Sequence, residues 1–511
     1  MPPEVETWAP SCTCVTLAPG GAGGFGEMQS VPPGRAARPQ AVSSVAPVPT
    51  GTRAPCVLAW EQASHPGDER HSAKPSGAPQ YATAVAVRVR FAPSPTGFLH
   101  IGSVHTALFN WLFARHEGGE FLLRIENTDT SREVEAATEQ IQESLRWLGL
   151  EWDGEVTFQL DRMPHAQEVA NQLVADEKAY EDDGAIRFRM PDEGTTSWDD
   201  LILGPIEYPN EKLEDVVLVR SDGRPTYNFV SPLEDMLDGI THVIRGQDHV
   251  SNTPKQLQIL AALGAELPAY AHVPLLNGPD GKPLSKRHGA VTVEEFRAAG
   301  FIPEALLNYL ALLGWSYDDH TEVMSRDELI ERFSLDRVGK SAATFDYEKL
   351  THMNGVYLRA LPPGDYADRL VAYLREQGYD WDEGLVRKVA PLVQEKIATL
   401  GEFPRFARFF FERVPPEEPL EDGAVLPAAA QVLAQVEPFE AATIEAALRE
   451  LAERLGLKPR QAFQPIRLAL TGSKVSPGLF ESLELLGRDE SIARINAPGS
   501  GLGGASGSSV R

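Results

Sequence analysis

The amino-acid sequence predicts an α/β fold built on a parallel sheet, followed by an all-helical region. Two observations carry this prediction. Between residues 85 and 125 a strand pattern, a helix pattern and a second strand pattern follow one another closely, as in a βαβ unit. Beyond about residue 301, apolar residues recur with the period of a helix, without a convincing strand. Because a βαβ unit has parallel strands and a right-handed crossover, the first two-thirds should hold a parallel sheet.

The first βαβ unit consists of three consecutive segments. Residues 85–91 alternate apolar and polar side chains as a strand does. Apolar residues between 104 and 112 then recur on one face of a helix, and the glycines at 118–119 supply its stop. Residues 121–125 again have the composition of a strand. The turn-rich segment 92–97 therefore lies at the carboxyl edge of the sheet, where open α/β sheets bind ligands.

Later segments extend this pattern. We predict that strands at 216–220 and 240–245 join the same sheet. A helix should begin near 252–254, with Ser251 or Asn252 as its cap. The final third has four clear helix patterns, at 304–313, 366–376, 385–400 and 441–455.

Bulk properties exclude several classes of protein. The 511 residues carry a formal net charge of −26, which argues against a protein that coats nucleic acid non-specifically. No stretch approaches the run of about 18 apolar residues that a membrane helix needs, and no secretion signal is recognisable. We therefore expect a cytoplasmic protein with no membrane partner. The three cysteines, Cys12, Cys14 and Cys56, all precede the predicted domains, so no zinc site built on cysteines is expected there.

Both ends of the chain have the composition of disordered tails. Residues 1–84 are rich in Pro, Gly, Ala and Ser without a sustained period, and residues 497–511 are rich in Gly and Ser. For the first segment we favour a solvated tail or a start codon assigned too early. A targeting or partner-binding arm has a weaker case, because Glu61, Asp68 and Glu69 offset its arginines.

The first candidate site is the segment 93–103, which joins the first strand to the first helix. Gly102 would let a purine ring lie against bare backbone. The helix start and the imidazole of His100 offer hydrogen-bond donors to phosphate oxygens. Such a loop is suited to ATP.

The second candidate site is the basic loop 281–289, which is bounded by glycines and follows the apolar stretch 273–276. Taken alone, a lysine-rich loop is most often ordinary solvated surface, and a single loop histidine such as His100 is usually a surface or packed residue. Neither segment decides a function by itself. Their combination is far more specific.

Together, the two segments resemble the signatures of class I aminoacyl-tRNA synthetases, and the whole pattern resembles glutamyl-tRNA synthetases of the bacterial type. The first segment resembles the histidine-isoleucine-glycine-histidine signature of that class. His100, Ile101 and Gly102 match, and Ser103 replaces the last histidine. In the glutamate enzymes that fourth position is commonly small, so the departure is mild.

The second segment resembles the lysine-methionine-serine-lysine-serine loop of the same class. Ser285, Lys286 and Arg287 match. Pro283 stands where the first lysine is usual, and Lys282 lies one place early. The resemblance runs from about residue 87 to 494, through four further ordered segments at 124–129, 225–229, 239–246 and 469–473.

The resemblance favours the glutamate enzyme over the glutaminyl enzyme, because residues 93–97 read Pro-Ser-Pro-Thr-Gly and the final third is helical rather than a β-barrel. It implies a Rossmann-like nucleotide-binding domain with a shortened insert, followed by an all-α anticodon-binding region. The implied parts are a disordered extension at 1–84, the first half of the catalytic domain at 85–163, a shortened acceptor-stem insert at 164–225, the second catalytic half at 226–300, a stem-contact helical region at 301–358, a helical anticodon-binding domain at 359–496 and a disordered tail at 497–511.

The implied activity is ATP-dependent conversion of L-glutamate to glutamyl-adenylate, followed by transfer to the 3′-terminal adenosine of tRNA(Glu). Because the substrate carboxylate is already a nucleophile, placement and charge neutralisation suffice and no protein general base is needed. His100 and Lys286 are the expected catalytic residues, with Mg²⁺ sharing the pyrophosphate charge and no zinc. The resemblance implies further ATP-binding positions at Gly102, Asp248, His249, Leu276, Ser285 and Arg287.

Selecting glutamate requires a cation for its side-chain carboxylate, and the planar fork of arginine suits that task. Arg90 and Arg245 each end a predicted strand at the ligand edge, and each matches a family position that contacts the amino acid. By the same resemblance Glu126 meets the substrate ammonium, while Ser94 and Tyr227 complete the pocket. Without the family context, a strand-end arginine would more often form a structural salt bridge.

The expected macromolecular partner is tRNA(Glu), bound by a monomer. In the helical third, a basic face for the anticodon arm is offered by Arg387, Lys388, Lys396, Arg405 and Arg408.

The shortened insert and Pro283 leave alternatives open. The enzyme could also charge tRNA(Gln), or the chain could be a tRNA-binding paralogue with impaired charging or one that modifies another acceptor. A relative that glutamylates a modified tRNA base lacks the helical third, so the presence of that third counts against this alternative. The joint presence of His100, Lys286, Arg90, Arg245 and Glu126 counts against a non-catalytic paralogue.

Overall fold

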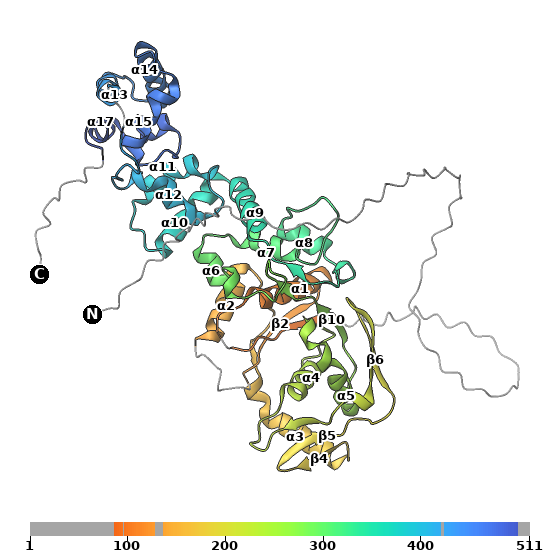
Figure 1. The fold of residues 1–511 in the computed structure, drawn as a ribbon. Coiled ribbons are helices and arrows are strands. Elements are labelled where there is room, and N and C mark those ends of the chain that lie inside the picture. The colour runs from red at the N-terminus through yellow and green to blue at the C-terminus, as the bar shows by residue number, and fades with distance from the viewer. Residues whose placement is uncertain (1–85, 96, 128–135, 421–423, 499–511) are drawn as a thin grey trace, which may run out of the picture. The chain divides into compact units, whose positions relative to one another are not determined.

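The computed structural model describes residues 86–95, 97–127, 136–420 and 424–498 (Figure 1). The predicted tails 1–84 and 497–511 lie outside the described residues, apart from Ala497 and Pro498. Thr96 and part of the matched segment 124–129 are outside as well. Within the described ranges, no helix combines the length and the apolar character needed to cross a bilayer.

The predicted βαβ unit is present. Strands β1 (Arg88–Phe91), β2 (Glu120–Ile125) and β3 (Thr157–Phe158) form a parallel sheet in that order. Helix α1 (Ile101–His116) connects β1 to β2 and buries most of its residues in the main apolar core. Gly118, with a φ of 64°, provides the left-handed turn that ends this connection, as the sequence predicted.

A second sheet has the strand order β7-β6-β10-β9. Its strands are β6 (Thr195–Asp200), β7 (Gly204–Pro209), β9 (His242–Gly246) and β10 (Ala269–Val273). The pairs β9 with β10 and β10 with β6 are parallel, whereas β6 and β7 form an antiparallel hairpin.

The two sheets meet where β1 lies beside β9. The Thr241 amide donates to the Arg88 carbonyl at 2.9 Å, and the Arg88 amide donates to Thr241 Oγ1 at 2.9 Å. From α1, Asn110 donates to the Ile244 carbonyl at 2.9 Å. The carboxyl ends of β1 and β9 are therefore neighbours, so the two arginine-bearing strands reach one edge, although β9 belongs to the second sheet and not, as predicted, to the sheet of β1.

Another strand assignment was wrong. The segment predicted at 216–220 forms β8 (Val216–Val219), but it does not join the parallel sheet. Instead it pairs antiparallel with β5 (Ala185–Phe188), which pairs in turn with β4 (Ala179–Asp182). This small sheet packs on helix α3 (Met163–Ala175) in an apolar cluster of its own. A short apolar run specifies a buried strand without specifying its neighbour, and here the β4-β5 hairpin supplies that neighbour.

Further helices pack around the strands of the first two-thirds of the chain. They are α2 (Ala137–Leu148), α4 (Tyr227–Leu237), α5 (Thr253–Leu263) and α6 (Val293–Ala298). Helix α5 begins where the sequence predicted, and Asn252 is its N-cap residue. The expected side-chain cap bond is absent there, because Asn252 has helical backbone angles and its amide lies 3.3 Å from His249 Nδ1.

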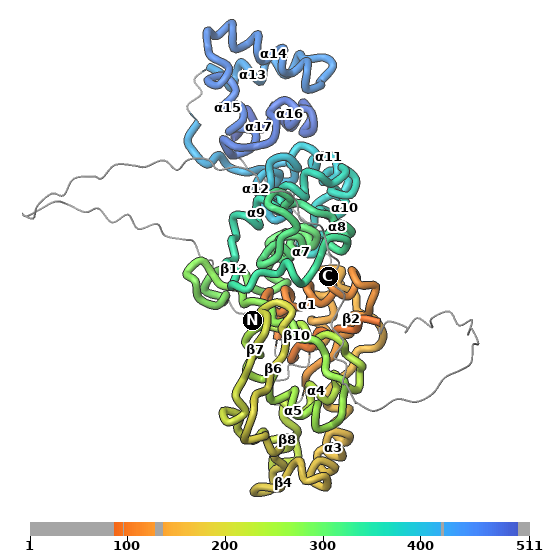
Figure 2. Tube along the Cα trace, turned by 90° about the vertical axis from the view of Figure 1, so that its right-hand side faces the viewer, coloured from red at the N-terminus to blue at the C-terminus, as the bar shows by residue number. Residues whose placement is uncertain are grey.

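The final third consists mainly of helices, as predicted (Figures 1 and 2). They are α7 (Pro303–Ala311), α8 (Arg326–Arg332), α9 (Tyr347–Ala360), α10 (Pro363–Glu376), α11 (Glu383–Gln394), α12 (Phe403–Ala407), α13 (Val425–Leu433), α14 (Ala441–Arg454), α15 (Pro459–Thr471), α16 (Leu479–Leu486) and α17 (Arg488–Asn496). Helices α10 to α12 surround one apolar cluster, and α13 to α17 surround another.

Two details of this region differ from the prediction. The helix predicted at 385–400 ends at Gln394, because the following chain turns so that the Leu400 amide can donate to the Gly300 carbonyl at 2.9 Å. A two-residue strand, β12 (Ala343–Thr344), pairs in parallel with β11 (Leu276–Asn277). That pairing ties the helical third to the segment just before the second candidate loop.

Candidate active site

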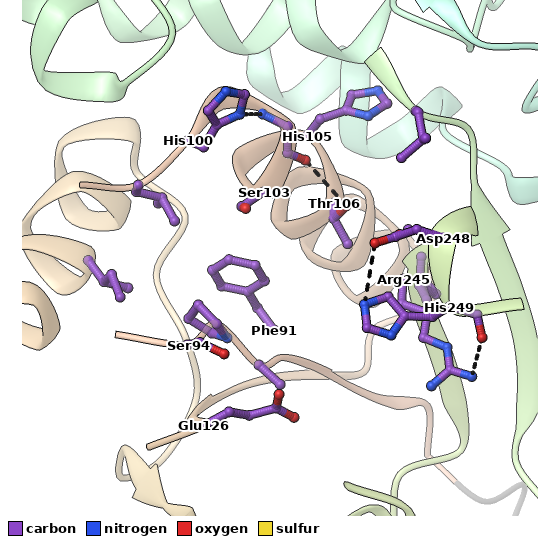
Figure 3. A pocket seen from close by; sticks show the side chains of 18 of the residues that line it. Phe91, Ser94, His100, Ser103, His105, Thr106, Glu126, Arg245, Asp248 and His249 are labelled. Carbon is purple, nitrogen blue, oxygen red and sulfur yellow. Dashed lines mark hydrogen bonds and ion pairs between the residues drawn. The ribbon is translucent and has the colours of Figure 1, made fainter. Parts of the chain in front are cut away.

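A pocket of about 770 Å³ opens at the carboxyl ends of β1 and β9, beside the start of α1 (Figure 3). Both predicted arginines and the first signature segment line it. The predicted site residues that the structure brings together on its walls are Arg90, Ser94, His100, Gly102, Glu126, Tyr227, Arg245, Asp248, His249 and Leu276. The ligand edge predicted from the βαβ pattern is therefore hollow, and it carries these side chains.

His100 is the N-cap of α1. Its Nδ1 accepts a hydrogen bond from the Gly102 amide at 3.1 Å, so a neutral ring carries its proton on Nε2. Burial lowers the pKa of His100 below its ordinary value, the Lys286 charge lowers it further, and Glu295 opposes both. At neutral pH the ring is thus an uncharged donor at the positive end of a helix.

The second candidate loop packs beside the first. The Ile101 amide donates to the Val291 carbonyl at 2.8 Å, and the Val293 amide donates to the Leu99 carbonyl at 3.2 Å. Pro283 and Leu284 line the same pocket as His100. The start of the second loop therefore lies at the same pocket as His100, whereas the approach of Lys286 to a nucleotide there stays a prediction.

The part of that loop that matches the signature lies outside the pocket wall. Ser285 caps a short 3₁₀ helix, Lys286–His288, and its amide donates to His288 Nδ1 at 3.1 Å. Lys286 and Arg287 are both exposed, and Arg287 lies 3.3 Å from Asp280. Ser285, Lys286 and Arg287 are not among the described residues that line the pocket, so their contact with ATP remains a prediction.

Arg90, at the end of β1, is only 4% exposed and forms a bidentate pair with Asp235 of α4. Its Nε donates at 2.8 Å and its Nη2 at 3.1 Å. Burial alone would raise the pKa of Asp235, but the charges of Arg90 and Arg124 hold it below its ordinary value. Part of the Arg90 fork is therefore committed inside the protein.

Behind Arg90 lies a buried charge cluster that the sequence reasoning missed. Arg124 lies 2.8 Å from Asp235, 3.1 Å from Glu234 and 3.3 Å from Asp238. Burial raises the pKa of Glu234 to about 7. The only sequence signal was the presence of carboxylates in α4 among apolar residues, which an exposed helix face would also show.

Glu126 joins this cluster from the pocket side. Its carboxylate lies 4.0 Å from Arg124, and its side chain is 11% exposed. Burial raises the pKa of Glu126 to about 7, although the charges of Arg124 and Arg90 oppose the shift. An ammonium ion entering the pocket would complement this carboxylate.

Arg245, at the end of β9, is 5% exposed and makes a different set of contacts. It donates from Nη1 to Gln256 at 2.7 Å, from Nη2 to Thr253 at 2.7 Å and from Nε to His272 at 3.2 Å. Its guanidinium also lies 5.2 Å from the centre of the Tyr270 ring. Within the described part of the chain these partners are neutral acceptors, and Arg245 has no direct ion pair with a carboxylate.

Tyr227 and His249 form the wall between the two arginines. The Tyr227 hydroxyl lies 3.1 Å from His249 Nδ1, and His249 Nε2 lies 3.7 Å from Asp248. Burial raises the pKa of Tyr227 and lowers that of His249. Both groups are therefore neutral at pH 7 and can donate or accept single hydrogen bonds.

Other lining residues were not singled out from the sequence. Phe98, inside the first signature, is 55% exposed although it is a large apolar residue, and Arg220 follows β8. Phe98 could have been noticed as an apolar residue in a turn-rich loop. No local pattern distinguishes Arg220.

The five residues predicted to contact the anticodon arm are all exposed, on or beside α11 and α12. Two of them are engaged in ion pairs: Arg387 with Asp368 at 2.5 Å, and Arg408 with Glu412. The structure places Arg387, Lys388, Lys396, Arg405 and Arg408 at the surface, and their contact with tRNA remains a prediction.

Comparisons with known proteins agree with one another. A sequence profile described as tRNA synthetases class I (E and Q), catalytic domain, matches residues 86–185 and 181–352, and one described as an anticodon binding domain matches residues 365–498. A glutamate–tRNA ligase of Caldanaerobacter subterraneus is 39% identical over 464 residues, covering 80% of this chain and 96% of the relative. A glutamate–tRNA ligase of Acidithiobacillus ferrooxidans is 42% identical over 462 residues, covering 80% and 98%.

A solved structure gives the same answer. The crystal structure of a glutamate tRNA ligase from Elizabethkingia meningosepticum, in complex with its amino acid, superposes with a TM-score of 0.72 at 30% identity. The match covers 81% of this chain and 99% of that one.

Proposed function

The chain belongs to the glutamate–tRNA ligase family of class I aminoacyl-tRNA synthetases, and we propose that it joins L-glutamate to the terminal adenosine of tRNA(Glu) at the pocket described above. The observation that carries this proposal is the convergence of Arg90, Arg245 and His100 on one pocket at the carboxyl edge of adjoining parallel strands. One end of the pocket wall suits a dicarboxylic amino acid, and the other suits a nucleotide.

In the first step, a carboxylate oxygen of glutamate attacks the α-phosphorus of ATP. The new oxygen–phosphorus bond forms as the bond to the bridging oxygen breaks, and pyrophosphate leaves. His100 Nε2 donates to a phosphate oxygen, aided by the start of α1. Lys286 neutralises charge on the departing pyrophosphate, because it belongs to the loop whose Pro283 and Leu284 line the pocket.

Mg²⁺ is the implied metal of this step, and it would share the pyrophosphate charge. The described residues contain no group of three His, Cys, Asp or Glu side chains placed to hold a metal ion. This donor set fits an ion coordinated mainly by ATP phosphates and water, the usual manner for Mg²⁺. Asp248, which lines the pocket, is the carboxylate that would assist in holding the ion, since Glu126 is assigned to the substrate ammonium.

We assign glutamate recognition to the part of the pocket that is lined by Arg90, Arg245 and Glu126. Arg245 receives the side-chain carboxylate, because it is nearly buried and its described partners are neutral. Arg90, whose Nε and Nη2 donate to Asp235, assists through its remaining nitrogen, Nη1. Glu126 receives the ammonium, and Ser94 and Tyr227 add single hydrogen bonds. Gly102, His249 and Leu276 then border the nucleotide, with Ser285 and Arg287 joining from the second loop.

In the second step, a hydroxyl of the terminal ribose attacks the adenylate carbonyl, and AMP leaves. We propose the boundaries 85–163, 164–225 and 226–300 for the catalytic halves and insert. Residues 301–358 and 359–496 would carry the stem and anticodon contacts, the latter through Arg387, Lys388, Lys396, Arg405 and Arg408. We further propose a monomer acting in the cytoplasm.

The test is charging of purified tRNA(Glu) with radioactive glutamate by the full chain. We expect product only when ATP, Mg²⁺, glutamate and tRNA are all present, and an acid-stable but base-labile ester. Absence of charging, with retained ATP–pyrophosphate exchange, would sink the acylation part of the proposal. The same assay with tRNA(Gln) decides whether the enzyme discriminates between the two tRNAs.

A further inference from the structure

Arg245 rests on a buried histidine–aspartate pair that the proposed chemistry does not use. His272 lies on β10, and Asp200 is the last residue of β6. Both side chains have 0% exposure, and His272 Nδ1 lies 2.5 Å from Asp200 Oδ2. Asp200 belongs to the hairpin segment before Pro225, whereas Arg245 and His272 belong to the following catalytic half.

The contacts determine where the histidine proton lies. A guanidinium Nε can only donate, so the 3.2 Å contact from Arg245 Nε requires a lone pair on His272 Nε2. The proton of the neutral ring therefore resides on Nδ1, from which it is donated to the Asp200 carboxylate. Burial lowers the pKa of His272, consistent with a neutral ring.

The other oxygen of Asp200 is held by the backbone. Asp200 Oδ1 accepts from the amides of Leu203 at 2.9 Å, Ile202 at 3.1 Å and His272 at 3.2 Å. Three N–H donors fix this oxygen as an acceptor, so the carboxylate can turn only by leaving all three unpaired. Its second oxygen is thereby aimed at the histidine.

We propose that Asp200 and His272 are positioning residues that set the direction of the Arg245 guanidinium and so determine the affinity for the side-chain carboxylate of glutamate. Asp200 selects the histidine tautomer, His272 accepts from Arg245 Nε, and the rest of the fork then faces the pocket. This inference rests on the proposed function, because it takes Arg245 as a receptor for the substrate carboxylate.

The substitution Asp200→Asn separates this role from a purely structural one. The amide oxygen must occupy the Oδ1 position, because three backbone donors point there, so the NH₂ group falls at Oδ2. It then donates to His272 Nδ1 and moves the ring proton to Nε2. That proton faces Arg245 Nε–H, donor against donor, and competes with Arg245 for Thr253 Oγ1, which lies 3.1 Å from Nε2.

The kinetic test measures ATP–pyrophosphate exchange and tRNA charging by the full chain. For Asp200→Asn we expect the KM for glutamate to rise about tenfold or more, equivalent to ~1.4 kcal/mol, with the KM for ATP unchanged. If Asp200 only anchors the hairpin, the asparagine keeps all three backbone bonds and the KM for glutamate stays at the wild-type value, which overturns the inference.

A matched control lies on the same strand. Thr196 of β6 donates to Asn210 Oδ1 at 2.6 Å and accepts from Gln258 at 2.8 Å, and neither of these hydrogen bonds involves Arg245, His272 or Asp200. Thr196→Val should weaken the hairpin yet leave the KM for glutamate unchanged. A rise as large as that of Asp200→Asn would contradict the inference.

A spectroscopic test reads the proton directly and needs no substrate. In histidine-selective ¹⁵N spectra we expect His272, identified by its loss in His272→Gln, to have an unprotonated Nε2 in the wild type and an unprotonated Nδ1 in Asp200→Asn. If Asp200→Asn raised the KM for glutamate while the His272 tautomer stayed as in the wild type, the proposal that Asp200 acts by selecting this tautomer would be overturned. If the wild type did not act on glutamate at all, the proposed function would fail, while the tautomer result would still stand on its own.

Discussion

Arg90 and Arg245 occupy equivalent places and have opposite surroundings. Each is the penultimate residue of a parallel strand, each is about 95% buried, with exposed fractions of 4% and 5%, and each lines the pocket. Arg90 is paired with the Asp235 carboxylate, whereas the described partners of Arg245 are neutral. The charge of Arg90 is already balanced inside the protein, so we expect Arg245 to be the stronger receptor for an incoming carboxylate.

The largest expected effect comes from Arg90. In Arg90→Ala, the buried Asp235 carboxylate keeps Arg124 as its remaining described partner. Breaking a buried ion pair in this way costs about 3–5 kcal/mol of folding stability. We expect a matching fall in the free energy of unfolding measured by urea denaturation. The control is Arg88→Ala on the same strand, whose pair with Glu120 is roughly half exposed and should be worth ~1 kcal/mol or less.

Arg245 should differ in kind. For Arg245→Ala we expect kcat/KM for glutamate to fall by a factor equivalent to roughly 2–5 kcal/mol of binding free energy. This is the range for truncating a buried charged partner in a complex. Stability should fall less than in Arg90→Ala, because the groups left behind are neutral. Arg245→Lys keeps the charge without the fork, so an intermediate kcat/KM is expected. Equal stability losses in the two alanine variants would remove the distinction between the arginines.

Replacing Lys286 should affect the rate of the activation step, whereas replacing either arginine should affect stability or glutamate binding. We expect Lys286→Ala to slow ATP–pyrophosphate exchange by raising the activation free energy by about 2.7–4 kcal/mol, the scale of losing one transition-state donor. The apparent affinity for glutamate should stay unchanged, since the lysine lies outside the pocket wall. An exchange rate equal to that of the wild type would refute the role given to this residue.

The smallest expected effect is a pH dependence of the KM for glutamate, which arises from Glu126 beside the Arg90 cluster. In the proposed site the substrate ammonium binds the ionised form of Glu126, and burial raises the pKa of that residue to about 7. The KM for glutamate should therefore rise as pH falls below about 7, by at most about tenfold per unit. In the absence of substrate the sign reverses for stability: a raised carboxyl pKa means that stability is lost as pH rises from about 4.5 to 7.

Glu126→Gln is the control for that prediction. It cannot ionise, so the glutamine variant should bind glutamate more weakly and show a flatter KM profile between pH 6 and pH 8. A profile that keeps the wild-type slope would point to Glu234 instead, because burial raises the pKa of that residue to a similar value.

Much of the site could be predicted because strand ends in a parallel sheet share one edge. Arg90 and Arg245 were found from strand patterns, and His100 from its place between a strand and a helix. The signature resemblance then supplied residues such as Glu126 and Tyr227. These features depend on neighbouring residues along the chain, so they can be recognised in a single sequence.

Features that depend on distant partners were not predictable in this way. Asp235 is 145 positions from Arg90, and Asp200 is 72 positions from His272. Neither pairing leaves a local pattern. The strand β8 was placed in the wrong sheet for the same reason, since its apolar residues specify burial and not a neighbour. The end of α11 likewise depends on a bond from Leu400 to Gly300.

The most direct measurement is a crystal structure of this chain with L-glutamate bound. We expect the side-chain carboxylate to lie within hydrogen-bond distance of the Arg245 guanidinium, the ammonium to face Glu126, and the Arg90–Asp235 pair to be unchanged. Glutamate bound through Arg90 after separation from Asp235, or bound outside the pocket, would contradict this expectation.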